Sequence, residues 1–323
     1  MAVADQHSNI ADQRSKIKAA KQALLRFLPK RARFGLNASR ARYLRVYEPE
    51  LRLVGPLCDR RLGSIDVGAM NGHFTFFMEW TSAWVAAYEP HPILFRQLCG
   101  AFGPTVKVMP YAISDRSGTT PLMLPHWEGK DQLGCATLEA QAPAHFEPRT
   151  ITVETRTIDE LDLGKIGFMK ISAEGHELAI LRGARAKILS DRPNMIVALQ
   201  NRLKPGLRED AIAWLAGLDY DGFFIRNMTG ASTGQFSIRT FHPDRTLHPV
   251  RDFVPDLQRP EHALQPDGSQ RGEYVWKFVF VHRSRPEVID RLGRRMSRWF
   301  HSPGAPAVSP EYCFIFFMVG FVP

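Results

Sequence analysis

Cysteines are few in this sequence of 323 residues, and none has the spacing of a redox or metal motif. The four are Cys58, Cys99, Cys135 and Cys313, and they include no C-x-x-C pair and no zinc-like spacing. Disulfide frameworks belong to exported proteins, whereas free thiols are the ordinary state in a reducing compartment. We therefore expect free cysteines, no metal site and a cytoplasmic location.

Long apolar runs are also lacking. No segment approaches the ~20 apolar residues with which a helix crosses a bilayer, and the first sixteen residues are polar. The apolar tail Cys313–Phe321 is too short to span a membrane; an added strand, a dimer contact, a membrane-surface anchor and a poorly ordered end all fit it. With 44% hydrophobic and 23% charged residues, the composition is that of a soluble globular protein.

Nucleotide-binding motifs are present only in part. No G-x-x-x-x-G-K-[ST] occurs, which argues against a P-loop. An apolar run over residues 63–67 leads into Gly68 and Gly72, and an amphipathic run follows, which predicts a strand, a tight turn and a helix. Met70 and His73 stand where a dinucleotide loop needs its second and third glycines. The turn favours an adenosine ligand without phosphates, of which S-adenosylmethionine is the common one.

Two acidic residues stand at the ends of expected strands. Asp66 ends the first strand, where a carboxylate can receive a ligand's ammonium group. Glu89 ends the next apolar run about 20 residues after the turn, where α/β nucleotide-binding folds hold ribose hydroxyls. A turn that binds no ligand would show a similar glycine pattern. The predicted cofactor-binding residues here are Asp66, Gly68, Asn71, Gly72 and Glu89.

Four stretches together resemble the FkbM-type methyltransferases. Tyr88–Pro92 is similar to their acidic strand end and Thr157–Leu161 to their TLDEL stretch. Met169–Glu177 and Leu181–Ala184 resemble their KIDVEGxE…LxGA block. The resemblance implies a class I (Rossmann-like) α/β fold with a seven-stranded, mostly parallel sheet whose last strand is antiparallel. It also implies S-adenosylmethionine as methyl donor and O-methylation of a sugar, a glycan or a secondary metabolite.

Several residues depart from the family pattern. Met70 takes the place of the usual asparagine in the glycine turn, and Asn71 follows it. Ser172 replaces an aspartate after the fourth strand, and Gln200 stands where a glutamate often ends the fifth. A catalytically impaired cofactor-binding or scaffold protein on the same fold is therefore the alternative. A nicotinamide-dependent oxidoreductase is a weaker third hypothesis, against which the incomplete glycine motif argues.

The chain divides into three expected regions. A basic helical extension covers residues 1–59, and a C-terminal helix with the apolar tail covers 286–323. Between them, residues 60–285 form the methyltransferase domain, with an insertion at about 227–273. Single helices are also predicted over residues 40–59 and 177–188.

The class I fold places the chain after the third strand beside the adenine. Val106–Pro110 reads as that strand, so the main chain or hydroxyl of Ser114 is a candidate contact to the base; an ordinary turn is the alternative. The following segment, 119–150, is rich in turn residues and is expected to be largely irregular. Its Trp127 would either cap a substrate pocket or anchor the loop.

Catalytic candidates gather after the expected fourth strand, 167–172, whose apolar run is broken only by Lys170. A hydroxyl nucleophile must lose its proton during methyl transfer. His176 has an unperturbed pKa suited to accepting it, and Glu174 would suit if burial raised its pKa. Both also fit ordinary positions near a helix N-terminus. The predicted catalytic residues are Lys170, Glu174 and His176.

Positive charge is concentrated near the N-terminus. Of the net charge of +9, eleven Lys or Arg lie between Gln13 and Tyr47 without one acidic residue, which leaves −2 on the rest. Apolar residues at helical spacing before Pro29 predict a basic amphipathic helix. The helix fits packing on the domain, contact with an acidic substrate, or peripheral contact with an anionic membrane surface. Nucleic acid is disfavoured because no aromatic residues are interleaved. The sequence is compatible with a homo-oligomer.

Overall fold

The computed structural model describes most of the predicted central domain. The described residues are 28–43, 49–127, 130–131, 133–139, 147–201, 204–225, 227–229, 241–243, 248–253 and 275–298. The predicted basic helix before Pro29, the apolar tail and most of the insertion at 227–273 lie outside these ranges, as does the side chain of Trp127. No helix within them is long and apolar enough to cross a bilayer.

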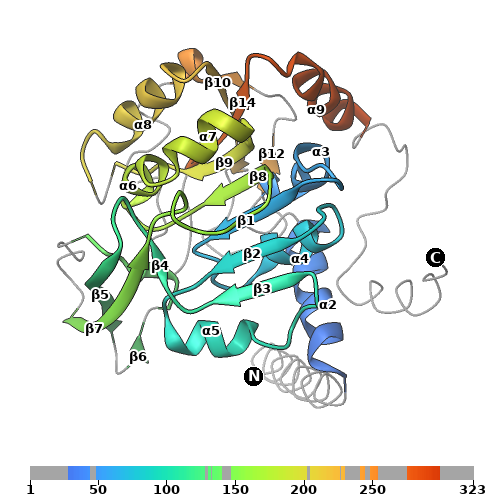
Figure 1. Cartoon of the computed structure of the whole chain (residues 1–323). Coiled ribbons are helices and arrows are strands. Elements are labelled where there is room, and N and C mark those ends of the chain that lie inside the picture. Colours follow the sequence, from blue (N-terminus) through green and yellow to red (C-terminus); the bar gives the residue numbers. More distant parts are fainter. Residues whose placement is uncertain are drawn as a thin grey trace, which may run out of the picture.

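An eight-stranded sheet forms the centre of the described structure (Figure 1). Its strands follow the order β13-β10-β14-β9-β8-β1-β2-β3. Their bounds are β1 Gly63–Val67, β2 Val85–Tyr88, β3 Val106–Met109, β8 Ile166–Ile171, β9 Asn194–Ala198, β10 Tyr220–Phe224, β13 His248–Pro249 and β14 Lys277–His282. Strands β1, β2, β3, β8 and β9 run parallel, whereas β14 pairs antiparallel with both β9 and β10.

This strand order confirms the expected class I methyltransferase fold, with its last long strand inserted antiparallel between two parallel ones. The expected count of seven strands was wrong, because the two-residue β13 adds an eighth. It pairs Phe223 with Pro249 and Phe224 with His248. The extra strand covers main-chain groups of β10 that an open sheet edge would leave unpaired.

Helices cover both faces of the sheet (Figure 1). One face carries α6 Glu177–Arg182, α7 Arg185–Asp191 and α8 Leu207–Ala216; the other carries α2 Lys30–Tyr43, α3 Val54–Leu57, α4 His73–Glu79, α5 Pro92–Leu98 and α9 Pro286–Arg298. Successive strand residues point to opposite faces. On β8, Met169 and Ile171 therefore pack under α6, α7 and α8, while Phe168 packs on the opposite side.

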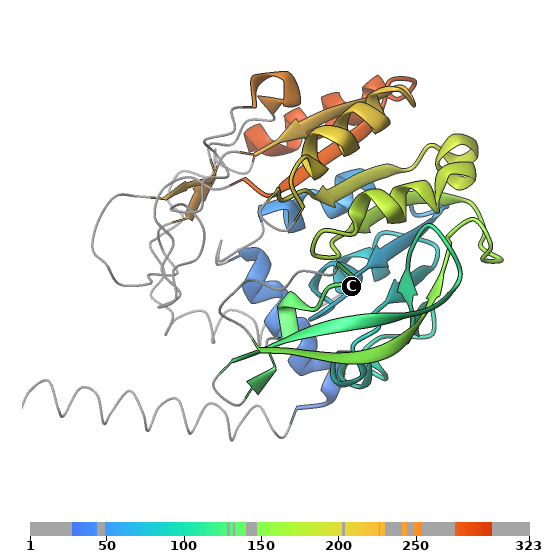
Figure 2. The ribbon, with the colours of Figure 1, turned by 90° about the vertical axis from the view of Figure 1, so that its left-hand side faces the viewer.

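A second, smaller sheet is built from the chain between β3 and β8 (Figure 2). Its strands, in the order β4-β7-β5-β6, are β4 Ala112–Ile113, β7 Glu147–Arg156, β5 Gly118–Trp127 and β6 Lys130–Asp131. The expectation that 119–150 is irregular was wrong for both ends of that segment. Buried Leu122, Leu124 and Val153 pack with Ala112 and give the paired ten-residue strands β5 and β7 a core of their own.

Short elements complete the described chain. They are the 3-10 helices η1 Pro49–Arg52, η2 Leu133–Cys135 and η3 Val250–Asp252, and the antiparallel strands β11 Asn227–Thr229 and β12 Phe241–Pro243. The predicted helix over 40–59 is not continuous: α2 ends at Tyr43, η1 begins at Pro49 and α3 begins at Val54. Proline lacks the N–H group that a helix needs at each interior position.

The predicted helix over 177–188 is also divided, into α6 and α7, at Gly183. The carboxylate of Asp159 accepts hydrogen bonds from two main-chain N–H groups in the first turn of α7, both at 2.9 Å, and so caps a new helix. At Gly183 a side chain has no room, because a Cβ there would lie 2.0 Å from the carbonyl oxygen of Ser114. The break thus lies where the main chain packs against the residue that follows β4.

We expect Gly183→Ala to lower the free energy of unfolding by about 1–3 kcal/mol, because the added methyl group would overlap the Ser114 carbonyl. Gly217→Ala is the matched control, since Gly217 also ends a helix with negative φ but a Cβ there meets nothing closer than 3.4 Å. Its effect should stay within about 0.5 kcal/mol. Urea denaturation measures both, and equal stabilities would contradict the close approach at Gly183.

Candidate functional site

A pocket of about 450 Å³ opens at the carboxyl ends of the parallel strands. The turn after β1, the start of α4, the ends of β2 and β8, the second sheet and the chain around the start of β14 form its wall. The lining residues are Val67, Gly68, Ala69, Met70, Asn71, His73, Phe74, Tyr88, Glu89, Pro90, Leu94, Ala112, Ile113, Leu122, Gly134, Cys135, Ala136, Leu138, Lys170, Ser172, Ala173, Glu174, Trp276 and Lys277. Ligands of open α/β sheets bind at this edge, so the pocket is the candidate site.

The turn after β1 brings main chain to the pocket wall. Gly68 has a φ of +69°, and a Cβ there would lie 1.9 Å from the carbonyl oxygen of Ser172. Glycine at this position lets the turn after β1 meet the end of β8. Met70, with a φ of +47°, and Asn71 both line the pocket, whereas Gly72 precedes α4 and is not among the lining residues.

Glu89 lines the pocket at the end of β2 with only 5% of its surface exposed. One carboxylate oxygen accepts a hydrogen bond from the N–H of Met70 at 2.7 Å, and the other from the N–H of His91 at 3.0 Å. Burial raises the pKa of Glu89, although both main-chain donors favour its charged form. Each carboxylate oxygen has a second lone pair, so Glu89 can also accept hydrogen bonds from a ligand.

Asp66 and Lys170 form a buried ion pair between neighbouring strands. They are register partners on β1 and β8, and Lys170 Nζ lies 3.1 Å from Asp66 Oδ1. Thr75 in α4 donates a hydrogen bond to Asp66 Oδ2 at 2.6 Å, and Lys170 donates one to the carbonyl oxygen of Gly68 at 2.7 Å. Lys170 lines the pocket, whereas the fully buried Asp66 lies beneath it. Asp66 therefore contacts Lys170 and Thr75 where a contact to a ligand was predicted.

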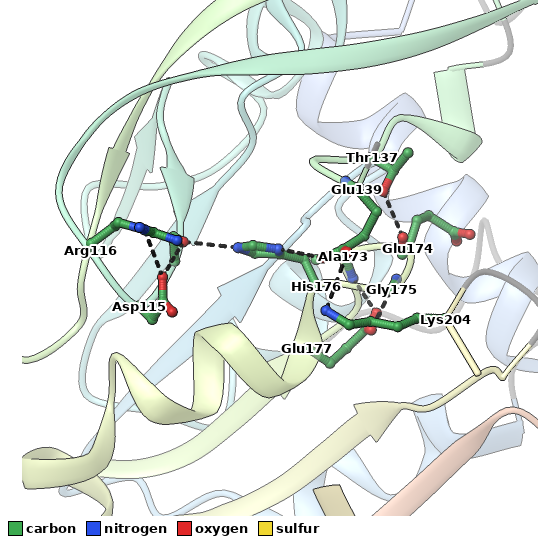
Figure 3. A network of polar contacts seen from close by, with 11 residues as sticks. Asp115, Arg116, Thr137, Glu139, Ala173, Glu174, Gly175, His176, Glu177 and Lys204 are labelled. Carbon is green, nitrogen blue, oxygen red and sulfur yellow. Dashed lines mark hydrogen bonds and ion pairs between the residues drawn. The ribbon is translucent and has the colours of Figure 1, made fainter. Parts of the chain in front are cut away.

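The turn after β8 is held by another buried carboxylate. Glu177 accepts hydrogen bonds from the N–H groups of Ala173 at 2.7 Å and Gly175 at 3.0 Å (Figure 3). Burial raises the pKa of Glu177 to about 7. Between these two donors, Glu174 has a φ of +44° and lines the pocket. A glutamate in the left-handed region costs free energy, and such residues persist where surrounding contacts fix them, as Glu177 does here.

Residues 133–139, here called the cover segment, form one side of the pocket wall. Gly134, Cys135, Ala136 and Leu138 line the pocket. The main chain of Thr137 exchanges two hydrogen bonds with Met123 of β5, at 2.8 and 3.0 Å. Its hydroxyl donates a hydrogen bond to the carbonyl oxygen of Glu174 at 2.7 Å (Figure 3). The cover segment is thus bound to the second sheet and to the turn after β8.

His176 joins three segments of the chain in a polar network (Figure 3). Its Nδ1 lies 2.8 Å from Glu139 Oε1, and its Nε2 lies 2.9 Å from the hydroxyl oxygen of Ser114. Glu139 also pairs with Lys204, with Oε2 and Nζ 3.2 Å apart. Neither His176 nor Ser114 lines the pocket. The network connects the end of the cover segment with β4 and the turn after β8.

The structure brings five of the nine predicted site residues together in one pocket. These are Gly68, Asn71, Glu89, Lys170 and Glu174. The other four lie close by but outside its wall: Asp66, Gly72, Ser114 and His176.

Sequence reasoning missed Thr75, the cover segment, Trp276 and Lys277. The position of Lys277 could have been predicted from the sequence. It shares the face of β14 that Val279 and Val281 occupy, and this face packs against α4. For Glu139 we find no local signal, since its partners lie 37 and 65 residues away.

Comparison with known proteins gives a family match. The family model described as the methyltransferase FkbM domain matches residues 66–223. No curated protein matches the sequence. A solved structure of a methyltransferase FkbM from Methylobacillus flagellatus KT is 15% identical with a TM-score of 0.36, over 57% of this chain and 43% of that one. The chain thus aligns with less than half the length of that protein.

Two further solved structures are similar over most of their own length. A precorrin-6y C5,15-methyltransferase from Geobacter metallireducens GS-15 is 12% identical with a TM-score of 0.36, over 73% of this chain and 90% of that one. A Streptococcus mutans protein assigned as a methyltransferase, solved in complex with SAH, is 12% identical with a TM-score of 0.35, over 61% and 94%. The strand order, rather than these low scores, establishes the fold.

Glu177→Gln should change the pH dependence of stability. Because the pKa of about 7 in the folded protein exceeds the ordinary 4.5, the folded state binds this proton more tightly than the unfolded chain does. The stabilising contribution is complete below pH 4.5 and is lost as the pH rises to about 7. The unfolding free energy of wild type minus that of Glu177→Gln should therefore be larger at pH 5 than at pH 8. Denaturation at both pH values measures it; a constant difference contradicts the raised pKa.

Proposed function

Because residues 66–223 form a methyltransferase domain of the FkbM family, we propose that this chain transfers a methyl group from S-adenosylmethionine to a hydroxyl group. The acceptor class that we propose is a sugar, a glycan or a secondary metabolite. Fold alone does not fix a reaction, and so the proposal depends on the pocket.

The position of Glu89 is the observation that carries the proposal. It lines the pocket at the end of β2, where it can accept hydrogen bonds from two ribose hydroxyls while its main-chain donors fix its orientation. Apolar Ile113, Leu122 and Leu138 line the same pocket and suit a purine ring. The main chain and Asn71 of the turn after β1 suit the amino-acid end of the cofactor. These features support an adenosine ligand without phosphates.

Methyl transfer needs alignment more than acid or base chemistry. S-adenosylmethionine supplies a methyl group on a positively charged sulfonium. Transfer would form a bond from the acceptor oxygen to that carbon as the carbon–sulfur bond breaks, and the hydroxyl proton would pass to a base. By fixing the end of β8 and the turn after β1 against each other, the chain holds both partners in line.

Glu174 is the candidate that we propose for the base. It lines the pocket, and its backbone is fixed by hydrogen bonds on either side, to Glu177 and Thr137. His176 has both ring nitrogens within hydrogen-bond distance of Glu139 and Ser114. We therefore assign His176 to positioning the cover segment.

A catalytically impaired cofactor-binding or scaffold protein is the second candidate. Ser172 lines the pocket where the resembling family has an aspartate, and Gln200 is buried where a glutamate is frequent. Both changes remove a carboxylate from this end of the sheet. The two candidates share the cofactor pocket and differ in turnover.

Calorimetry with S-adenosylhomocysteine tests the cofactor site. We expect the wild type to bind, and Glu89→Gln to bind at least about tenfold more weakly, because a hydrogen bond to a charged group contributes roughly 1.5–3 kcal/mol. Glu287→Gln is the matched control, an exposed glutamate in the first turn of α9, and should bind like the wild type. No binding by the wild type, or equal binding by the two variants, would overturn the assignment.

Labelled transfer from S-adenosylmethionine into fractionated metabolites and glycans tests turnover. We expect Glu174→Gln to lower the rate by about 10²–10⁴-fold, the usual contribution of a base, while affinity for S-adenosylhomocysteine stays near that of the wild type. Binding without labelled product from the wild type would favour the impaired candidate. An unchanged rate in the variant would remove Glu174 from the mechanism.

A further inference from the structure

Glu139 is the last residue of the cover segment, and its carboxylate binds two other segments of the chain (Figure 3). Its Oε1 lies 2.8 Å from His176 Nδ1, and its Oε2 lies 3.2 Å from Lys204 Nζ. His176 is the residue before α6, and Lys204 precedes α8. One carboxylate thus holds the end of the cover segment against two segments of the domain that lie far from it in sequence.

The imidazole ring of His176 is held at both nitrogens. Its Nε2 lies 2.9 Å from Ser114 Oγ, and the main-chain N–H of Ser114 donates to the carbonyl oxygen of Arg156 in β7 at 3.0 Å. The ring therefore has one orientation, with Nδ1 directed at Glu139. Only 15% of the His176 side chain and 21% of the Glu139 side chain are exposed. Salt and water screen such a partly buried contact less than they screen a surface pair.

The order serine, histidine and carboxylate is also that of a hydrolase triad. Two observations argue against that role here. Ser114 is only 5% exposed and does not line the pocket, so a molecule in the pocket does not reach its hydroxyl. The carboxylate of Asp115 lies 3.3 Å from Ser114 Oγ, where it would repel the oxyanion that develops in acyl transfer. The network therefore fixes geometry rather than supplying a nucleophile.

The cover segment supplies an apolar part of the pocket wall beside the residues proposed for the adenine. Ala136 and Leu138 line the pocket and pack on the small core of the second sheet, which contains Leu122. Glu139 directly follows Leu138. A movement of Glu139 away from His176 would therefore carry Leu138 out of the wall.

Resting on the proposed methyltransferase function, we propose that Glu139 is a positioning residue that retains the nucleoside in the pocket. Through its bonds to His176 and Lys204 it holds the cover segment against the adenosine, which contacts the segment and not Glu139 itself. Loss of these bonds raises the dissociation rate, the quantity through which most changes in a binding surface act. It does so equally for S-adenosylhomocysteine and methylthioadenosine, because both carry the adenosine.

Stopped-flow tryptophan fluorescence measures the release of both nucleosides from the full chain, since Trp276 lines the pocket. We expect Glu139→Gln to release each about tenfold faster than the wild type, because the amide keeps the size of the side chain but loses the charge that strengthens both bonds. Glu154→Gln is the matched control, a glutamate of β7 paired with Arg156 and absent from the pocket wall, and should release both at the wild-type rate. Release from Glu139→Gln at the wild-type rate overturns the proposal.

A double-mutant cycle separates positioning from a general loss of stability. His176→Gln and Glu139→Gln both remove the contact between these two residues. The double variant should therefore release S-adenosylhomocysteine faster than the wild type by much less than the product of the two single factors. Factors that multiply would mean that the two residues act independently, which contradicts the proposal.

Hydrogen exchange in the protein without a nucleoside tests the same bonds separately from binding. The N–H of Thr137, which donates to Met123 of β5, should exchange faster in Glu139→Gln than in the wild type, because the cover segment opens more often. Equal exchange rates overturn the role of Glu139. Failure of the wild type to bind either nucleoside would instead sink the proposed function, so the two failures are distinguishable.

Discussion

The buried ion pair between Asp66 and Lys170 is the constraint on which the geometry of the pocket depends. It joins β1 to β8 at the edge where the pocket opens. Asp66 also accepts a hydrogen bond from Thr75 of α4, and Lys170 also donates to the carbonyl oxygens of Val67 and Gly68. Removing one partner of such a pair leaves a buried charge uncompensated, which typically costs about 3–5 kcal/mol. The ion pair and its hydrogen bonds thus hold β1, the turn after β1 and α4 together at the edge of the sheet where the pocket opens.

Much of the fold was predictable because its signals are local. Apolar runs and the glycine turn placed β1, β2, β3 and β8 within a few residues. Strand β5 of the second sheet was missed because Pro121 and Pro125 interrupt its alternation, and proline within a run argues against a strand. The break between α6 and α7 was missed because the side chain that caps α7 is distant in sequence: Asp159 lies 27 and 28 residues before the N–H groups that it accepts from.

The residues of the site were predictable where their position at the end of a strand brings them to the pocket. Glu89 follows β2 directly, and Lys170 is the last residue but one of β8. Both line the pocket because these parallel strands end at the same edge of the sheet. Ser114 and His176 fit the same rule, yet they contact each other outside the wall, and Glu139 completes their network from a segment with no local signal. The sequence pattern predicts which residues lie near the edge of the sheet where the pocket opens. Which way each side chain points is decided by partners that only the folded chain brings close.

The wall of the pocket is formed by stretches inside and outside the range that the family model matches. Glu89, the glycine turn and the end of β8 lie inside the 66–223 family match, whereas Trp276 and Lys277 lie beyond it, on a strand that returns to the sheet after the 227–273 region. Substitutions on β14 can therefore alter one end of the cavity while the end formed by Glu89 and the glycine turn keeps its geometry. The residues at the two ends of the cavity can thus change independently of one another.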